Sequence, residues 1–192
     1  MEVERESMDY DVVVVGAGPS GLSTAIKLKQ LNPEMNVCVL EKGSEVGAHI
    51  LSGNVFETRA LDELIPDWRS KDSPIKTKVT KEKFLFLSKK SSLNWPTWLL
   101  PSVQKNHKNY IISLANLCRW LASEAESLGV EIFPGFAASK ILYSDDDHGI
   151  GVQTGDMGID KDGKKKDSFE PGININAKVT VFAEGCRGHL GK

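Results

Sequence analysis

The stretch DVVVVGAGPSGLSTAIKLKQLNPEMNVCVLE, residues 11–41, decides the fold of this chain. Its β-branched run, Val12–Val15, is typical of a strand that is buried on both faces. Gly16, Gly18 and Gly21 follow as G-x-G-x-x-G, and an apolar helix face continues beyond them. The order of strand, glycine turn and helix predicts the start of a parallel α/β sheet.

Each part of this pattern suits the binding of a dinucleotide. The first glycine permits a tight turn, the second lets a pyrophosphate approach the backbone, and the third lets the helix pack closely against the strand. The N-terminus of the helix offers free N–H groups to the phosphates. After a second apolar strand, Val37–Leu40, Glu41 lies twenty residues beyond Gly21, where a carboxylate can accept hydrogen bonds from a ribose. The alternative is a glycine-rich turn in an ordinary α/β protein, but all four parts in register favour a dinucleotide site.

Composition limits the other classes of function. A hydrophobic content of 40% supports a core, and a net charge of −2 gives no indication of a nucleic-acid partner. Cys38, Cys118 and Cys186 lie far apart without a C-x-x-C, which argues against a disulfide framework and against a metal cluster held by this stretch alone. No apolar run approaches the roughly 18 residues that span a bilayer, so we expect any membrane contact to be monotopic.

The two ends of the chain differ in character. The N-terminal MEVERESMDY is acidic and polar, unlike a secretory signal or a transit peptide. The C-terminal FAEGCRGHLGK stops just after a predicted strand and a glycine turn, where a helix should begin. We therefore expect an incomplete chain, the N-terminal piece of a longer protein.

Two apolar segments allow more than one interpretation. The loop at 46–66 is either packed over the core, with a short helix at 58–64, or a flap that covers a cofactor or touches lipid. After a predicted strand at 83–88, the stretch SSLNWPTWLLP at 91–101 places two tryptophans close to two prolines, which oppose a helix and a central strand. It is either a tryptophan-anchored loop on the core, or an interfacial anchor or quinone-pocket wall, because Trp favours the membrane–water boundary.

The middle of the chain repeats the α/β pattern. Ser113 can cap a helix that runs to about Leu128, with Gly129 as its C-terminal stop. A short strand is predicted at Val130–Phe133. The residues at 135–139 then lie at a strand end, where backbone groups could meet an adenine.

The C-terminal part favours FAD over NAD. The strand-rich residues 140–176 predict an antiparallel β-meander. The stretch KVTVFAEG, residues 178–185, predicts a buried strand that ends in small residues and a glycine. In flavoenzymes with this fingerprint such a late strand returns to the parallel sheet and brings its glycine to the cofactor. Arg187 and His189 just beyond are interpreted as structural residues.

The predicted fold class is therefore α/β, an FAD-binding Rossmann-like parallel sheet of the glutathione-reductase type with an antiparallel β-meander or second α+β region. The predicted organisation is a first FAD-binding segment (1–75, with the apolar flap 46–66), the start of a quinone- or substrate-side domain (76–110), a return to the FAD domain (111–139), a β-meander (140–176) and the late strand and turn (177–192).

Six stretches carry a resemblance to a known family. They are VVVVGAGPSGLSTAIKLKQL, EKGSEVGAHILSG, LIPDW, NYIISLANLCRWLASEAESLGVEIFPGFAA, GDMGIDKDG and VTVFAEGCRGHLGK. In this order, over nearly the whole chain, they resemble the N-terminal part of the electron transfer flavoprotein–ubiquinone oxidoreductases. This likeness is more specific than the glycine fingerprint, which many flavoproteins share.

The resemblance implies an FAD, a [4Fe–4S] cluster and a ubiquinone site on a protein that dips into one membrane leaflet, the bacterial inner membrane or, in a eukaryote, the mitochondrial inner membrane. It implies reduced electron transfer flavoprotein as donor and the quinone pool as acceptor. The family's cluster cysteines lie far downstream, so the cluster ligands are expected outside this chain. The family also has a membrane-embedded segment where the loop at 46–66 falls.

No general base is required for this chemistry, so we predict no catalytic residue, and no metal ligand in this chain. The predicted cofactor-binding residues are Gly16, Ala17, Gly18, Pro19, Ser20, Gly21, Glu41, Lys42, Gly47, His49, Ser52, Gly53, Ala138, Ala183 and Gly185. Gly47 to Gly53 are expected on the flavin side, and Gly185 is expected to close the pocket. Two alternatives are a FixC-like or geranylgeranyl-reductase-like FAD oxidoreductase without the iron–sulfur domain, and an inactive, truncated FAD-binding fragment.

Overall fold

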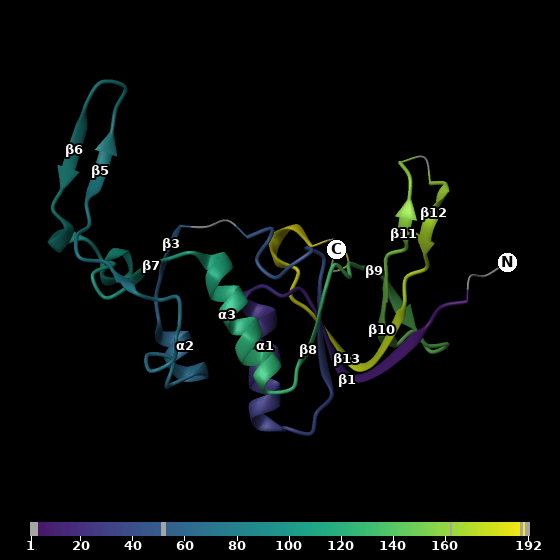
Figure 1. Ribbon diagram of the computed structural model, residues 1–192. Helices are drawn as coiled ribbons and strands as arrows, with labels where there is room; N and C mark the ends of the chain where they lie inside the picture. Colours follow the sequence, from purple (N-terminus) through teal and green to yellow (C-terminus); the bar gives the residue numbers. More distant parts are fainter. Residues whose placement is uncertain (1–3, 51–52, 162, 189, 191–192) are drawn as a thin grey trace. The chain divides into compact units, whose positions relative to one another are not determined.

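The computed structural model describes residues 4–50, 53–161, 163–188 and 190 (Figure 1). The chain forms two compact units, a first unit of residues 1–50 and 118–192 and a second unit of residues 51–117. The α-helices and strands follow in the order β1 (Ser7–Val15), α1 (Pro19–Leu31), β2 (Val37–Glu41), β3 (Asn54–Phe56), α2 (Arg59–Leu64), β4 (Thr77–Lys78), β5 (Phe84–Leu87), β6 (Ser92–Trp95), β7 (Tyr110–Ile112), α3 (Leu114–Ser127), β8 (Glu131–Pro134), β9 (Ala138–Tyr143), β10 (Gly149–Thr154), β11 (Met157–Ile159), β12 (Lys165–Glu170) and β13 (Asn174–Phe182).

A six-stranded sheet organises the first unit, in the order β8-β2-β1-β13-β10-β9. The first four strands of this order run parallel, and β10 and β9 continue the sheet in antiparallel fashion. Val12 of β1 lies opposite Val37 of β2 on one side and opposite Val179 of β13 on the other. The predicted parallel α/β sheet is confirmed, and so is the return of the late strand to a place beside the first.

The centre of this sheet is buried on both faces, as the run of valines predicts. Val13 and Val14 are fully buried although they point to opposite faces. α1 packs against β1 and β2, and its Leu22 and Ile26 are also fully buried. Burying one such aliphatic side chain contributes about 1.5–3 kcal/mol, so these residues hold the β–α–β unit together.

α3 begins and ends where the sequence predicts. The Ser113 hydroxyl accepts a hydrogen bond from the Asn116 N–H at 3.4 Å, which caps the helix. Gly129 stands just beyond the last turn with φ of +82°, the left-handed conformation that favours glycine. The predicted apolar stripe is buried at Cys118, Leu121 and at neighbouring positions of the same face.

The residues predicted as a β-meander divide between two sheets. β9 and β10 extend the main sheet, whereas β11 and β12 form a separate two-stranded ribbon. A clamp lies where the ribbon leaves the sheet. The Arg5 guanidinium donates to the Asp156 carboxylate and, at 2.9 Å, to the Gly172 carbonyl, while the Gly172 N–H donates to Asp156 at 2.8 Å. This clamp joins the entry of β1, the entry of β11 and the entry of β13.

The second unit has its own small core. β3, β7 and β4 form an antiparallel sheet, and β5 and β6 form a separate hairpin. Trp68 is only 2% exposed, and its indole N–H donates to Asp62 at 2.7 Å. Its ring meets the Tyr110 ring edge to face, with 5.9 Å between centroids. Among the described residues, no helix is long and apolar enough to cross a bilayer.

The interpretation of 91–101 as a loop anchored on the core is wrong. Ser92–Trp95 forms strand β6, which pairs with β5, and Trp98 is 74% exposed. Pro96 follows the last paired residue, so the hairpin loses no backbone hydrogen bond to it. The aromatic residues of this stretch therefore lie on the surface of the protein.

In the apolar segment at 46–66, by contrast, several apolar side chains are buried. Val46, Leu61 and Ile65 are all less than 10% exposed, and the expected short helix is α2. These three side chains pack against the protein, as the first interpretation expects, whereas contact of the rest of the segment with a cofactor or lipid stays a prediction. Val55 is 48% exposed, and residues 51 and 52 lie outside the described part of the chain.

The Arg5 clamp makes a prediction about pH. The Arg5 guanidinium, helped by the Gly172 N–H, holds the pKa of Asp156 at about 2, below the ordinary value of an aspartate. A depressed pKa stabilises the fold at pH values above the ordinary one, and this contribution is lost as pH falls through the folded-state value. Asp156→Asn should therefore be less stable than the parent at neutral pH, and the difference should shrink toward pH of about 2.

Urea unfolding followed across this pH range measures the difference, with Asp145→Asn, an exposed aspartate in the β9–β10 turn, as the control. If the difference in the free energy of unfolding between parent and Asp156→Asn stayed constant with pH, the stabilising role of the Arg5–Asp156 pair would be wrong.

Candidate functional site

α1 begins directly after β1, through the turn Gly16–Gly18. Gly18 precedes the helix in extended conformation, and Pro19 takes the first helical position, where its missing N–H breaks no intrahelical bond. No described side chain caps α1, and its first turn carries no acidic residue. The N–H groups and the positive dipole end at this terminus therefore lack a capping side chain of their own, which suits the binding of an anion.

The three glycines of the motif meet different neighbours. A Cβ on Gly21 would lie 2.0 Å from the Gly16 carbonyl oxygen, and a Cβ on Gly16 would lie 2.6 Å from the Ala183 carbonyl oxygen. The fold itself thus requires glycine at both positions. A Cβ on Gly18 would meet no atom within 4 Å. The space over Gly18 is open, which fits the close approach of a pyrophosphate.

Glu41 is held beside this turn. One carboxylate oxygen accepts the Ala17 N–H at 3.1 Å, and the other accepts the Gly43 N–H at 2.7 Å. A carboxylate has about four lone-pair sites, so both oxygens keep capacity to accept a ribose hydroxyl. The structure brings the predicted acid and the predicted glycine turn together.

The loop after β2 is anchored from two other elements. The Gly135 N–H, just beyond β8, donates to the Gly43 carbonyl at 2.7 Å. Arg119 on α3 pairs with Glu45 at 2.9 Å. Gly43 is not among the predicted cofactor-binding residues, although a glycine two residues after the acid is a signal for its contact with Glu41. A Cβ there would come within 3.0 Å of the Glu41 carboxylate.

The end of β13 lies at the same edge of the sheet as the glycine turn. The Ala183 N–H donates to the Val15 carbonyl at 2.8 Å, so Ala183 stands beside Gly16. Gly185 follows with φ of +73° at the start of the 3₁₀ turn Gly185–Arg187. Ala138, at the start of β9, is 4% exposed and packs in the core cluster with Leu40. The late-strand residues are thus placed at the glycine turn, whereas an adenine contact at Ala138 stays a prediction.

The remaining predicted positions are not all brought to this turn. Lys42 and His49 are exposed residues of the loop after β2, and Gly47 is a buried turn residue with φ of +87°. Gly53 belongs to the second unit, and Ser52 lies outside the described residues, as does His189. A cofactor contact at each of these positions stays a prediction.

The two buried cysteines are not reactive at neutral pH. Burial, followed by the Glu131 carboxylate, raises the pKa of Cys38 to about 12. Burial, followed by the Glu41 carboxylate, raises the pKa of Cys118 to about 11. Both therefore stay protonated thiols, which are poor nucleophiles. The described residues contain no group of three or more His, Cys, Asp or Glu side chains that could hold a metal ion.

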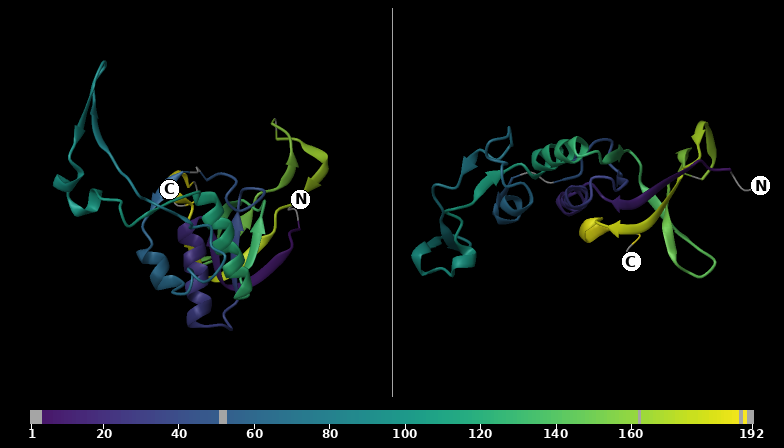
Figure 2. Two further views of the ribbon diagram at one scale, coloured as in Figure 1. Left: turned by 60° about the vertical axis from the view of Figure 1, so that its left-hand side comes forward. Right: turned by 90° about the horizontal axis from the view of Figure 1, so that it is seen from below.

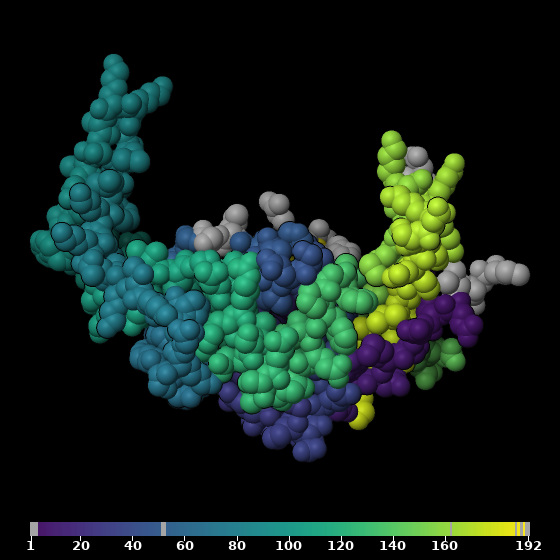
Figure 3. All heavy atoms as spheres, in the orientation of Figure 1, coloured from purple at the N-terminus to yellow at the C-terminus, as the bar shows by residue number. Residues whose placement is uncertain are grey.

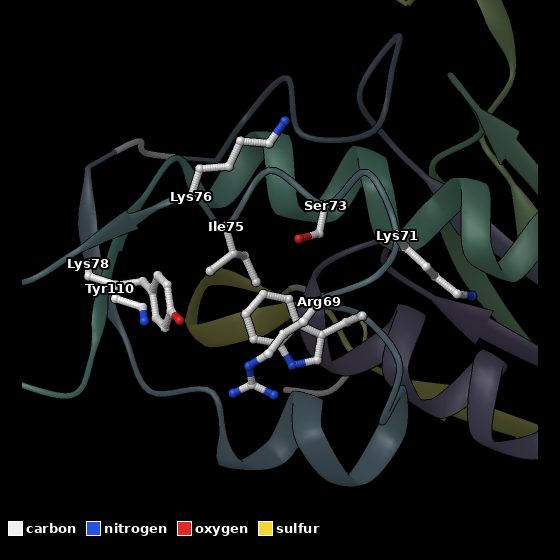
Figure 4. A pocket seen from close by; sticks show the side chains of 8 residues that line it. Arg69, Lys71, Ser73, Ile75, Lys76, Lys78 and Tyr110 are labelled. Atoms are coloured by element: carbon white, nitrogen blue, oxygen red, sulfur yellow. The ribbon is translucent and has the colours of Figure 1, made fainter.

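A cavity of about 260 Å³ lies in the second unit (Figure 4). Trp68 and Tyr110 line it together with Ser73, whose hydroxyl points into it, whereas the ammonium groups of Lys71 and Lys76 point away. The Arg69 guanidinium covers the Trp68 ring at 4.3 Å from its centroid. No predicted cofactor-binding residue lines this cavity, so it is not part of the glycine site.

The contrast among the glycines makes a second prediction. Gly18→Val should leave the free energy of unfolding nearly unchanged, because its Cβ meets no protein atom, but should abolish retention of FAD. Gly21→Val should instead lower the free energy of unfolding by about 1–3 kcal/mol, because overpacking forces α1 away from the turn.

Flavin absorbance of the purified protein and urea unfolding measure the two effects, with Lys27→Val on the exposed side of α1 as the control. If Gly18→Val kept its full flavin content, the assignment of the pyrophosphate to this turn would be wrong.

Comparison with known proteins shows which proteins share the fold that carries this site. Residues 1–64 match the model of the Thi4 family. A geranylgeranyl bacteriochlorophyll reductase-like protein from Thermoplasma acidophilum aligns with a TM-score of 0.66 at 19% identity, over 93% of this chain and 40% of its own. The myxobacterial halogenase CndH, an FAD-dependent halogenase, aligns with a TM-score of 0.60 at 16% identity, over 95% of this chain and 38% of its own. The fold is therefore that of FAD-dependent oxidoreductases.

Sequence relatives are much closer. The mitochondrial electron transfer flavoprotein–ubiquinone oxidoreductase of Oryza sativa subsp. japonica is 57% identical over 97% of this chain and 32% of its own length. The probable enzyme of the same name from Acinetobacter baylyi is 56% identical over 99% of this chain and 34% of its own length. The chain thus spans about a third of the relatives that it matches. Over nearly all of its residues, it is homologous to the electron transfer flavoprotein–ubiquinone oxidoreductases.

Proposed function

We propose that the complete protein passes electrons from reduced electron transfer flavoprotein, through bound FAD, to ubiquinone. The observation that carries this proposal is the identity of 54–57% over nearly the whole chain to proteins named for that activity. Relatives that share half of their residues over such a length rarely differ in the fold and cofactor of the shared part. The donor, the acceptor and the activity belong to the whole protein and are part of the proposal.

In this proposal the first unit binds the FAD. Gly16, Gly18 and the N-terminus of α1, with Ala17, Pro19, Ser20 and Gly21, hold the diphosphate, and Glu41 accepts the ribose hydroxyls. Lys42 and Ala138 would contact the adenosine, and Gly47 and His49 would contact the flavin. The contacts expected at Ser52, which lies outside the described residues, and at Gly53, which belongs to the second unit, stay predictions. Ala183 and Gly185 close the pocket from β13. When bound, the flavin accepts electrons singly or in pairs, so it can connect one-electron and two-electron partners.

The [4Fe–4S] cluster of the proposed electron path would be held by residues outside this chain. Such clusters are bound by cysteine thiolates. Cys38 and Cys118 are buried thiols in separate elements, and Cys186 lies at the turn after β13. This arrangement favours structural cysteines in the part of the protein that the chain contains.

We propose that the membrane contact lies in the second unit, on the β5–β6 hairpin and the turns after it. Several large apolar side chains are exposed there, with Leu87 76% exposed, Leu93 62% exposed and Trp98 74% exposed. Exposed apolar patches mark interaction or membrane sites, and Trp favours the interface. The membrane would be the bacterial inner membrane or, in a eukaryote, the mitochondrial inner membrane.

A FixC-like or geranylgeranyl-reductase-like oxidoreductase is the second candidate function, because a reductase-like protein shares this fold with a TM-score of 0.66. The fold alone does not discriminate between them. The chain is 57% identical to an electron transfer flavoprotein–ubiquinone oxidoreductase but only 19% identical to the reductase-like protein, which favours the electron transfer enzyme. The third candidate is an inactive, truncated FAD-binding fragment.

The activity is tested with the complete, FAD-loaded protein, reduced electron transfer flavoprotein as donor and a soluble ubiquinone analogue as acceptor. We expect quinone reduction that depends on the donor, and loss of this reduction in Gly18→Val together with its flavin. A flavin-loaded protein that reduces no quinone with this donor would exclude the proposed function and favour the reductase-like alternative. A complete protein that binds no flavin would favour the inactive one.

The membrane contact is tested separately. Leu93→Ser combined with Trp98→Ser should weaken co-sedimentation with phospholipid vesicles by tenfold or more, because burying each side chain contributes about 1.5–3 kcal/mol. Both side chains are largely exposed, so the fold should be unaffected. Leu31→Ser, which is equally exposed at 72% but lies on α1, should bind as the parent does. Equal binding of all three proteins would show that the hairpin is not the contact.

A further inference from the structure

One segment of the second unit carries a net positive charge, although the net charge of the whole chain is negative. The predicted substrate-side segment, residues 76–110, holds eight lysines and one acidic residue, although the whole chain has 24 basic and 26 acidic residues and a net charge of −2. The lysines are Lys76, Lys78, Lys81, Lys83, Lys89, Lys90, Lys105 and Lys108. A net charge of +7 is therefore concentrated in the segment that also exposes the apolar hairpin.

The hairpin has two different faces. Phe84 lies opposite Trp95 and Phe86 lies opposite Leu93, so these four side chains share one face. The aromatic rings on this face meet edge to face, with 5.4 Å between the ring centroids of Phe84 and Phe86 and 5.9 Å between those of Phe86 and Trp95. This face is wholly apolar. The other face combines two leucines with Ser92 and Asn94.

The tip of the hairpin is cationic. The turn at 88–91 is closed by the Ser88 N–H, which donates to the Ser91 carbonyl at 2.8 Å. Lys89 and Lys90 stand at this turn, fully on the surface, and neither forms a hydrogen bond or ion pair with a described residue. Figures 1 and 2 show the hairpin extending away from the small sheet of its own unit, and Figure 3 shows its atoms uncovered on the face drawn.

The one acidic residue of the segment does not neutralise this tip. The Glu82 carboxylate accepts the Asn106 N–H at 2.8 Å and so ties the base of β5 to the loop before β7. Lys105 donates to the Trp98 carbonyl at 3.3 Å in the same loop. The ammonium groups of Lys89 and Lys90 are thus exposed to solvent, with no acidic residue of the segment beside them.

The apolar face and the cationic tip of the hairpin together favour a lipid bilayer as the partner. Placing two ammonium groups in the hydrocarbon is costly, so the hairpin does not enter a bilayer tip first. It can lie along the surface instead, with the apolar face toward the acyl chains and the lysines at the level of the phosphates. Lysines at this depth attract acidic lipids.

We propose that residues 76–110 form a cationic and apolar surface that binds bilayers containing acidic phospholipids in preference to neutral bilayers. This inference rests on the membrane contact of the proposed function and names the lipid class that the contact selects. The apolar face supplies binding to any bilayer, and the lysines supply the preference.

The test uses the complete, FAD-loaded protein and two kinds of vesicle, phosphatidylcholine alone and phosphatidylcholine mixed with phosphatidylglycerol. Binding should be tighter to the mixed vesicles, and salt should weaken that binding alone. Lys89→Gln combined with Lys90→Gln should reduce affinity for the mixed vesicles by about fivefold for each lysine and leave binding to phosphatidylcholine unchanged. The matched control, Lys164→Gln with Lys166→Gln on the β11–β12 ribbon, should bind both vesicles as the parent does.

The outcomes separate this inference from the proposed function. Equal binding of the parent to both kinds of vesicle would overturn the lipid preference and leave the membrane contact standing. The same loss in both double variants would overturn the role of the hairpin tip. Binding to neither vesicle would overturn both the preference and the proposed membrane contact.

Discussion

The closeness of α1 to the turn that precedes it is the constraint on which the first unit depends. A Cβ at Gly21 would lie 2.0 Å from the Gly16 carbonyl oxygen, and a Cβ at Gly16 would lie 2.6 Å from the Ala183 carbonyl oxygen. These contacts let β1, α1 and β13 meet at one edge of the sheet. Gly18, between them, meets nothing within 4 Å. Two glycines of the motif are therefore required by the fold, whereas the space over the third is open for the proposed ligand.

The binding turn is organised in advance by the protein's own hydrogen bonds. Glu41 accepts the N–H groups of Ala17 and Gly43, and the Gly43 carbonyl accepts the Gly135 N–H. These bonds hold β2, the glycine turn and the exit of β8 together. A loop that is already ordered loses less conformational freedom on binding, which favours affinity. The same bonds explain why the acid stands at the end of β2.

Prediction from the sequence succeeded where local pattern and tertiary structure agree. The valines of β1, the glycine turn, the ends of α3 and the return of β13 follow from hydrophobic runs and glycine positions, and all are observed. At 91–101 it left two alternatives open, and the one that anchored a tryptophan loop on the core failed. Trp95 ends a strand whose partner, β5, is itself apolar, and the pair makes an exposed hairpin. Which side of an apolar strand meets solvent depends on what other elements cover it, and no local pattern states this.

The amino-acid sequence by itself determined the parallel α/β sheet, the glycine turn, the position of Glu41 and the excess of lysine in 76–110, because each is a property of residue type and spacing along the chain. Only the tertiary structure decided that Ala183 stands beside Gly16, that Gly43 links Glu41 to Gly135, and that Val46, Leu61 and Ile65 are buried while Leu87 and Trp98 are exposed. These facts depend on contacts between residues distant in the chain. Burial is set by the elements that pack together, whereas hydrophobicity belongs to the residue alone.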